Sequence, residues 1–118
     1  MADLKQLLER LLDAEIEFVI VGGFAAVLHG STLVTRDLDV CTLLTDINVE
    51  KLRGILADLA PVHRMAGGRL DFLTNPDPGV PVKNLYLETN AGAIDLLSSI
   101  TGVGGFERVR SSAVDVVL

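Results

Sequence analysis

Apolar positions near the start of the chain switch between the period of a helix and that of a strand. In LKQLLERLLDA, the leucines at positions 4, 7, 8, 11 and 12 form one stripe of an amphipathic helix over 4–14, with Asp3 as its cap. The apolar run in EFVIV predicts a buried strand over 17–21 that leads into Gly22. GFAAVLHG has helical composition and a glycine at each end, so we expect a short helix over 23–30.

A second strand and a second long helix follow. DLDVCTL alternates acids with apolar residues, which is typical of a strand over 37–43 with one polar and one apolar face. TDINVEKLRGILADLAP predicts a helix over 45–61, with acids in its first turn and Pro61 as its stop. Its apolar face consists of Val49, Leu52, Ile55, Leu56 and Leu59.

The period then shortens to that of strands. VHRMA and RLDFL are separated by Gly67 and Gly68, which is the spacing of a tight hairpin. The proline-rich stretch NPDPGVP predicts a surface loop over 75–81. VKNLYLE and AIDLL flank the polar turn TNAG and predict a second hairpin over 82–97.

These elements predict an α+β fold with a mixed sheet of about five strands and helices packed on it. The length of 118 residues fits one domain, over 1–118. The closing stretch SSAVDVVL, over 111–118, resembles the opening of another strand. Either that strand closes the fold or the chain lacks a C-terminal segment, and we favour the second interpretation.

Composition narrows the class of protein. Hydrophobic residues make up 49% of the chain, with few aromatics, so we expect an aliphatic core. No apolar run reaches the roughly 18 residues of a membrane span, and acids interrupt the apolar start, so we expect a cytoplasmic protein that does not enter a membrane. Cys41 is the single cysteine, which excludes an intrachain disulfide and a Cys-based metal site. The net charge of -6 disfavours nucleic-acid binding through a basic face of the chain itself.

Two aspartates in the 37–43 strand are candidate metal ligands. Side chains alternate between the faces of a strand, so Asp37 and Asp39 share a face roughly 6 to 7 Å apart while Leu38 and Val40 face the core. Paired carboxylates on a rigid strand suit Mg²⁺, either one ion or two bridged ions that support in-line phosphoryl displacement.

Two glycines that precede this strand in the sequence are candidates for binding the phosphates of a substrate whose metal the aspartates would hold. Gly22 and Gly23 fall at the turn between the 17–21 strand and the expected helix, where absent side chains and free N–H groups favour phosphate binding. Asp95 lies in an otherwise apolar strand and is the candidate third ligand, because a neighbouring metal would offset the cost of burying its charge.

Each of these features also has an ordinary structural interpretation. Asp-Leu-Asp occurs at solvated strand ends, paired glycines after a strand often form only a turn, and an acid on a strand edge discourages aggregation. His29 and His63 are expected to be a helix-end and a sheet-surface residue. Arg64, Arg69 and Lys83 are expected on a solvated sheet face, from which they could reach an acceptor. The order and spacing of the acids and glycines together favour a metal and triphosphate site.

The combination of strand, GG, helix, DLDV and a later isolated Asp resembles the nucleotidyltransferase fold of DNA polymerase beta and antibiotic nucleotidyltransferases. The string VGGFAAVLHG followed by T.DLDV is most similar to the small bacterial branch that includes AbiEii-type abortive-infection toxins. The similarity covers nearly the whole chain.

The resemblance implies roles for individual positions. Gly22 and Gly23 match the motif that holds the β and γ phosphates, although the second position is often Ser in the wider family. Asp37 and Asp39 match the metal-binding pair. Asp95 matches the third acid, which helps to bind the catalytic metal and activates the acceptor hydroxyl. Two Mg²⁺ ions and a nucleoside triphosphate are therefore the expected cofactor and substrate.

The chain departs from this family in two places. Relatives commonly read HG..R.T.DLD; here Thr35 is kept as a nucleotide-binding candidate, Leu33 replaces the Arg, and Arg36 is a substitute on the opposite strand face. Relatives also continue into a strand and a Lys-bearing helical segment over the nucleotide. We therefore expect this chain either to bind metal and nucleotide weakly and turn over poorly, or to depend on a partner chain for that segment.

The resulting expectation is a Mg²⁺-dependent transfer of a nucleoside monophosphate from a nucleoside triphosphate to a hydroxyl, with release of pyrophosphate. The acceptor could be a tRNA 3′ end, a protein hydroxyl or a small molecule. Two alternatives remain: a catalytically weak or inactive nucleotide-binding regulator of the toxin–antitoxin type, which Leu33 and the short C terminus favour, and an α+β interaction domain whose acids are surface charges.

Overall fold

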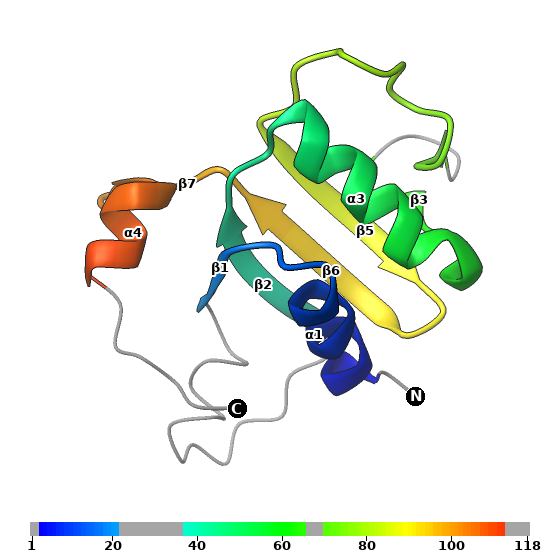
Figure 1. Cartoon of the computed structure of the whole chain (residues 1–118), viewed down its shortest axis with the longest axis horizontal. Coiled ribbons are helices and arrows are strands. Elements are labelled where there is room, and N and C mark those ends of the chain that lie inside the picture. Colours follow the sequence, from blue (N-terminus) through cyan, green and yellow to red (C-terminus); the bar gives the residue numbers. More distant parts are fainter. Residues whose placement is uncertain (1–2, 22–36, 66–69, 113–118) are drawn as a thin grey trace.

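The computed structural model describes residues 3–21, 37–65 and 70–112 of the chain. In these ranges, six strands form one mixed sheet with helices packed on it (Figure 1). The α+β class expected from the hydrophobic pattern is therefore confirmed. The helix expected over 23–30 lies outside the described residues, as do Gly67 and Gly68 of the first hairpin.

The sheet has six strands, where about five were expected. Their order across the sheet is β1, β2, β6, β5, β3, β4. Strands β2 and β6 are parallel, and every other neighbouring pair is antiparallel. The bounds are β1 (Phe18–Val21), β2 (Asp37–Thr42), β3 (Val62–His63), β4 (Leu70–Asp71), β5 (Asn84–Thr89) and β6 (Gly92–Leu97). Because β3 pairs with the outer edge of β5, both strands of the first hairpin extend the same sheet.

Helix α1 (Leu4–Asp13) forms where the leucine spacing predicts it. The Asp3 side chain caps it by accepting a hydrogen bond of 3.1 Å from the Gln6 N–H. Leu4, Leu7, Leu8 and Leu11 are buried. Leu12 was expected on the same stripe but is 50% exposed, because it lies at the margin of the stripe near the end of the helix.

Helix α3 (Asp46–Leu56) is shorter than the helix expected over 45–61. It begins at a Thr45 cap that accepts from the Asn48 N–H, and it continues as a single 3₁₀ turn, η1 (Ala57–Leu59). Ala60 then has φ of 50° in the left-handed region, which ends the helical path before Pro61. The expected apolar face is confirmed: four of its five residues, Val49, Leu52, Leu56 and Leu59, are buried and Ile55 is half-buried.

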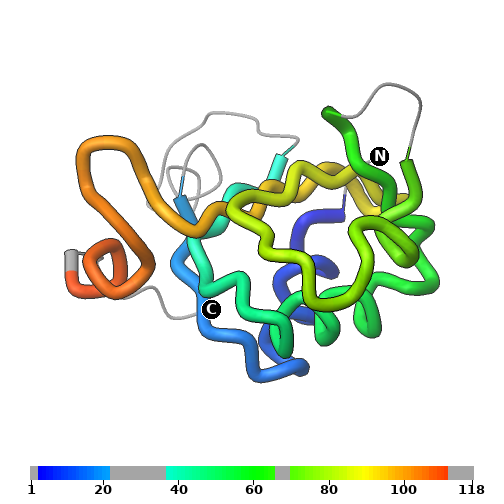
Figure 2. Tube along the Cα trace, turned by 90° about the horizontal axis from the view of Figure 1, so that it is seen from above, coloured from blue at the N-terminus to red at the C-terminus, as the bar shows by residue number. Residues whose placement is uncertain are grey.

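The main core lies between one face of the sheet and the two helices α1 and α3, which are on the same side of it (Figure 2). Leu38 and Val40 of β2 and Ile94 and Leu96 of β6 are fully buried in this core. Because side chains alternate along a strand, the residues between them point to the opposite face of the sheet. Aspartates 37, 39 and 95 are among those residues.

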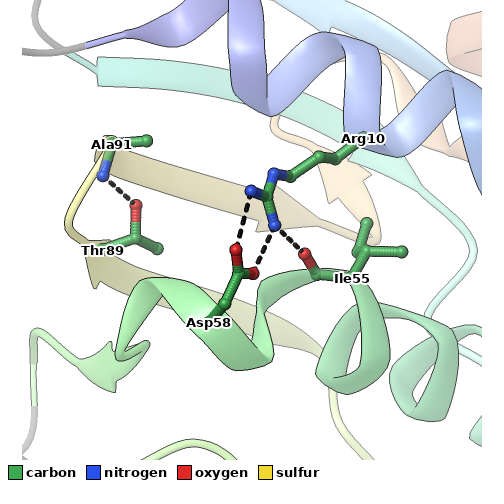
Figure 3. A network of polar contacts seen from close by, with 5 residues as sticks. All are labelled: Arg10, Ile55, Asp58, Thr89 and Ala91. Carbon is green, nitrogen blue, oxygen red and sulfur yellow. Dashed lines mark hydrogen bonds and ion pairs between the residues drawn. The ribbon is translucent and has the colours of Figure 1, made fainter.

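Polar contacts connect the helices beside this core (Figure 3). The Arg10 guanidinium of α1 donates a hydrogen bond of 2.6 Å to the Ile55 carbonyl and forms an ion pair with Asp58. The hydrogen bond from Arg10 lowers the pKa of the Asp58 carboxyl.

In the turn between β5 and β6, the Thr89 hydroxyl accepts from the Ala91 N–H at 3.1 Å and donates to the Gly92 carbonyl at 2.7 Å. The second hairpin is thus confirmed and its turn is closed by a side chain.

The loop over 75–81 is confirmed as a surface segment that a buried arginine anchors. Arg53 of α3 is 7% exposed, and its Nε donates to the Phe72 carbonyl at 3.0 Å. Its guanidinium also bonds the Pro76 carbonyl and the Glu50 carboxylate. The cost of burying the arginine charge is offset because its N–H donors have acceptors both in the segment after β4 and on α3 itself.

The C-terminal part contains a helix that the hydrophobic pattern did not predict. A small two-stranded sheet, β7 (Ser99–Ile100) and β8 (Gly104–Gly105), leads into α4 (Phe106–Ser112). Phe106 and Val109 pack on Cys41, on the face of the sheet opposite the main core. The strand expected over 111–118 is wrong at its first two residues, which belong to α4, and residues 113–118 lie outside the described ranges. Only two apolar residues of α4 contact the sheet, too few to give a helical period in the sequence.

The alternation along β6 gives a stability prediction. Leu96→Ala should lower the free energy of unfolding by about 3 kcal/mol, because it leaves a cavity in the core, whereas Leu97→Ala on the other face should cost roughly 1 kcal/mol. Urea unfolding followed by circular dichroism measures both. Equal losses for the two variants would contradict this assignment of the faces.

Candidate acidic site on the sheet

The three candidate aspartates lie on one face of two neighbouring strands. Asp37 and Asp39 are on β2, and Asp95 is on β6. In the parallel pairing of these strands, Asp39 is the register partner of Asp95, and Asp37 is the partner of Ala93. The fold therefore brings together the three acids that the sequence singled out, although Asp39 and Asp95 are 56 positions apart in the sequence.

Strand β1 ends beside the same acids. Val21, its last residue, is the antiparallel partner of Asp39. The next residue is Gly22, so the backbone leaves the described part of the chain at the position where the sequence has its paired glycines. Gly22, Gly23 and Thr35 themselves lie outside the described residues, as do Leu33 and Arg36.

Asp39 is in the least favourable position of the three for a charged group. Its Oδ1 atom is buried and has no hydrogen-bond partner among the described residues. Burial raises the pKa of Asp39, and the negative charges of Asp95 and Asp37 raise it further, while the Arg64 charge lowers it. A hydrogen bond between the carboxyl groups of Asp39 and Asp95, which requires a proton on one of them, also raises the pKa of Asp39.

Asp95 has a cationic partner that sequence reasoning did not assign to it. The Nη2 atom of Arg64 donates a hydrogen bond of 2.7 Å to Asp95 Oδ1. The Asp95 side chain is 17% exposed and that of Arg64 is 31% exposed, so the pair is only partly solvated. Arg64 is exposed, as expected of a solvated sheet face, and the order of the strands also brings its guanidinium to Asp95.

The backbone explains how Arg64 reaches this position. Arg64 directly follows β3, and its N–H donates a hydrogen bond of 2.8 Å to the Tyr86 carbonyl on β5. Tyr86 is in turn the antiparallel partner of Asp95 on β6. The guanidinium therefore spans β5 to reach Asp95. Nothing in the sequence near Arg64 indicates this, because the contact depends on two strand pairings, β3 with β5 and β5 with β6.

His63 has a structural role, as expected of a sheet residue. Its Nε2 atom forms a hydrogen bond of 2.7 Å with the Asn75 carbonyl, and its ring contacts the Phe72 ring edge-on with 5.6 Å between centroids. It lies on the strand that contributes to the first hairpin and packs against the loop after β4.

The acids meet one requirement of a cation site and lack another. The buried, unpartnered Oδ1 of Asp39 is a hard oxygen ligand of the kind that Mg²⁺ prefers. Within residues 3–21, 37–65 and 70–112, however, no group of three or more His, Cys, Asp or Glu side chains has an arrangement that could hold a metal ion. Asp95 is instead oriented toward Arg64. Asp39 and Asp95 thus form an acidic pair, and the Arg64 guanidinium of the same chain provides a positive charge beside Asp95.

Comparisons with protein-family models, with curated proteins and with solved structures found no match to this chain. The helices in the described ranges include none that is long and apolar enough to cross a membrane.

The raised pKa of Asp39 predicts a pH-dependent effect of substitution. A carboxyl whose pKa is higher in the folded than in the unfolded chain contributes stability below its unfolded pKa, and that contribution is lost as the pH rises through its folded pKa. Without divalent ions, Asp39→Asn should therefore raise the melting temperature at pH 7, and the gain should shrink on acidification.

Thermal unfolding in the presence of a chelator, from pH 7 down to about pH 4, measures this difference. We expect a gain of a few degrees at pH 7, since about 1 kcal/mol shifts the melting temperature by roughly 3–6 °C in a chain of this size. Asp77→Asn, in the exposed loop, makes the same change in net charge and should have little effect. A melting temperature at pH 7 that falls in Asp39→Asn would show that the ionised carboxylate stabilises the fold.

Proposed function

We propose that this chain is a divalent-metal-dependent nucleotidyltransferase, which transfers a nucleoside monophosphate from a nucleoside triphosphate to a hydroxyl acceptor. The observation that supports it best is the register of β2 and β6, which places Asp39 beside Asp95 with a buried oxygen of Asp39 unpartnered. Similarity of the sequence motifs to the nucleotidyltransferase fold supports the same assignment.

In this proposal the three carboxylates have different tasks. Asp37 and Asp39, on one face of β2, would hold the cation, and Asp95 would complete the set from β6. Bound Mg²⁺ would supply charge neutralisation at the α phosphate and the leaving pyrophosphate. Asp95 would also accept the proton of the attacking hydroxyl; its position on the same face as Asp39 and its partial exposure to solvent support this role.

The glycine motif would serve the other end of the substrate. Strand β1 ends at Val21 beside Asp39, so a phosphate held by the N–H groups after Val21 would be close to the acids. Thr35 lies two residues before Asp37, the first residue of β2, and is the further nucleotide-binding candidate. The acceptor is a tRNA, a protein hydroxyl or a small molecule, and the acidic net charge of -6 means that an RNA acceptor would require positive charge from a partner chain.

A second candidate is a nucleotide-binding regulator that has little or no transfer activity. The ion pair between Arg64 and Asp95 favours it, because the carboxylate oxygen that Arg64 occupies is not free to bind a metal ion or an attacking hydroxyl. Transfer of labelled nucleoside monophosphate to any acceptor would exclude this candidate, whereas metal-dependent nucleotide binding alone is compatible with both.

Metal-dependent nucleotide binding is the first property to test. We expect the purified chain to bind at least one of the four nucleoside triphosphates by calorimetry when Mg²⁺ is present and not when it is chelated. Asp39→Asn should weaken this binding by about 10–100-fold or more, because loss of a metal ligand costs at least as much as loss of a group that supports one. It should also abolish any label transfer while leaving the circular dichroism spectrum unchanged.

The exposed acid Asp77 again provides the matched control, since Asp77→Asn changes the net charge equally. Nucleotide binding that is unaffected in both Asp37→Asn and Asp39→Asn would show that the acids do not form the site. Absence of any metal-dependent binding in the unsubstituted chain would contradict the proposed function and leave an interaction domain with structural acids.

A further inference from the structure

We propose that Arg64 exchanges partners at this site: it pairs with Asp95 when no divalent cation is bound, and it turns to the triphosphate when a cation occupies the acids. The inference rests on the proposed function and adds to it a residue that opposes metal binding and supports triphosphate binding. Its structural basis is the ion pair of 2.7 Å between Arg64 Nη2 and Asp95 Oδ1.

The first step concerns competition for one carboxylate. Arg64 occupies Asp95 Oδ1, and among the described residues Asp95 is the one hydrogen-bond acceptor of its guanidinium. A divalent cation that takes Asp95 as a ligand needs the same oxygen atoms, and two cations that share one carboxylate repel each other. Cation binding and the Arg64–Asp95 pair therefore oppose each other.

The ion pair is suited to such an exchange because its two members differ in exposure and in their position in the sheet. Asp95 is fixed in the middle of β6 between two paired strands, and its side chain is 17% exposed. Arg64 follows the two-residue strand β3, and its side chain is 31% exposed. The long arginine side chain can turn toward solvent while the carboxylate stays in place. Partly exposed ion pairs are weak, so a divalent ion can displace the arginine.

The second step concerns the released guanidinium. An arginine freed from Asp95 remains tethered beside the acids through the backbone bond from its N–H to the Tyr86 carbonyl. A guanidinium binds phosphate oxygens through two parallel hydrogen bonds, which makes a triphosphate a better partner than water. The same residue would thus oppose the metal in the absence of nucleotide and support the nucleotide once metal is bound.

This exchange predicts effects of opposite sign in one variant. In Arg64→Gln, the affinity for Mn²⁺ alone should rise by about fivefold, since a competing ion pair of this exposure is removed. The affinity for inorganic tripolyphosphate at saturating Mn²⁺ should fall by about tenfold, since a charge-assisted contact is lost. Calorimetry measures both values without requiring any acceptor or turnover.

Arg110→Gln is the matched control. Arg110 also belongs to an exposed ion pair, with Glu17 and Glu107, and its loss changes the net charge equally. Glu17 precedes Phe18, the partner of Thr42, so this pair lies at the far end of β2 from Asp37 and Asp39. Both affinities should change less than twofold in Arg110→Gln. Asp39→Asn added to Arg64→Gln should abolish the metal affinity that Arg64→Gln gains.

The outcomes separate this inference from the proposed function. Metal affinity that is unchanged or lower in Arg64→Gln overturns the exchange but leaves the metal site intact. A higher metal affinity with unchanged tripolyphosphate affinity also overturns it, because Arg64 would then only mask the acid. Absence of Mn²⁺ binding in the unsubstituted chain and in Arg64→Gln overturns the proposed function, and the exchange with it.

Discussion

The parallel pairing of β2 with β6 is the constraint on which the candidate site depends. The other four neighbouring pairs in the described sheet are antiparallel, and they follow from local connections or edge additions. The β2–β6 pair joins two strands that are distant in the sequence and aligns Asp39 with Asp95. A shift of one residue in this register would turn the acid of one strand into the core, so the buried leucines and the site specify the same alignment.

The two faces of the central strands have opposite requirements, and the alternation of a strand satisfies both. On one face, Leu38, Val40, Ile94 and Leu96 are fully buried under α1 and α3 and provide the hydrophobic stabilisation. On the other face, carboxylates cluster where charge is costly, and Arg64 offsets part of that cost. The hydrophobic core thus holds together a group of acids that would repel one another in isolation. Carboxyl groups whose pKa is perturbed by burial and by like charges, as that of Asp39 is, occur preferentially at functional sites.

The covered and open parts of that second face differ in chemistry. Phe106 and Val109 of α4 cover Cys41 with apolar contacts, toward the end of β2 that pairs with the start of β1. The acids lie toward the other end of β2, where Asp37 is exposed. A single strand therefore carries an apolar contact for α4 and a polar site within six residues. Cys41 therefore has a packing role. Its thiol is buried, and this burial raises its pKa.

The sequence by itself determined the local elements, because caps, periods and turns act over a few residues. The Asp3 cap and the turn of the second hairpin lie where the pattern placed them. The sequence also showed that Asp37 and Asp39 share a face, because side chains alternate between the two faces of a strand. Only the tertiary structure decided that Asp95 is the register partner of Asp39, that Arg64 pairs with Asp95, and that Leu12 is exposed. Those facts depend on strand order and helix docking, which join residues far apart in the chain and leave no local periodicity.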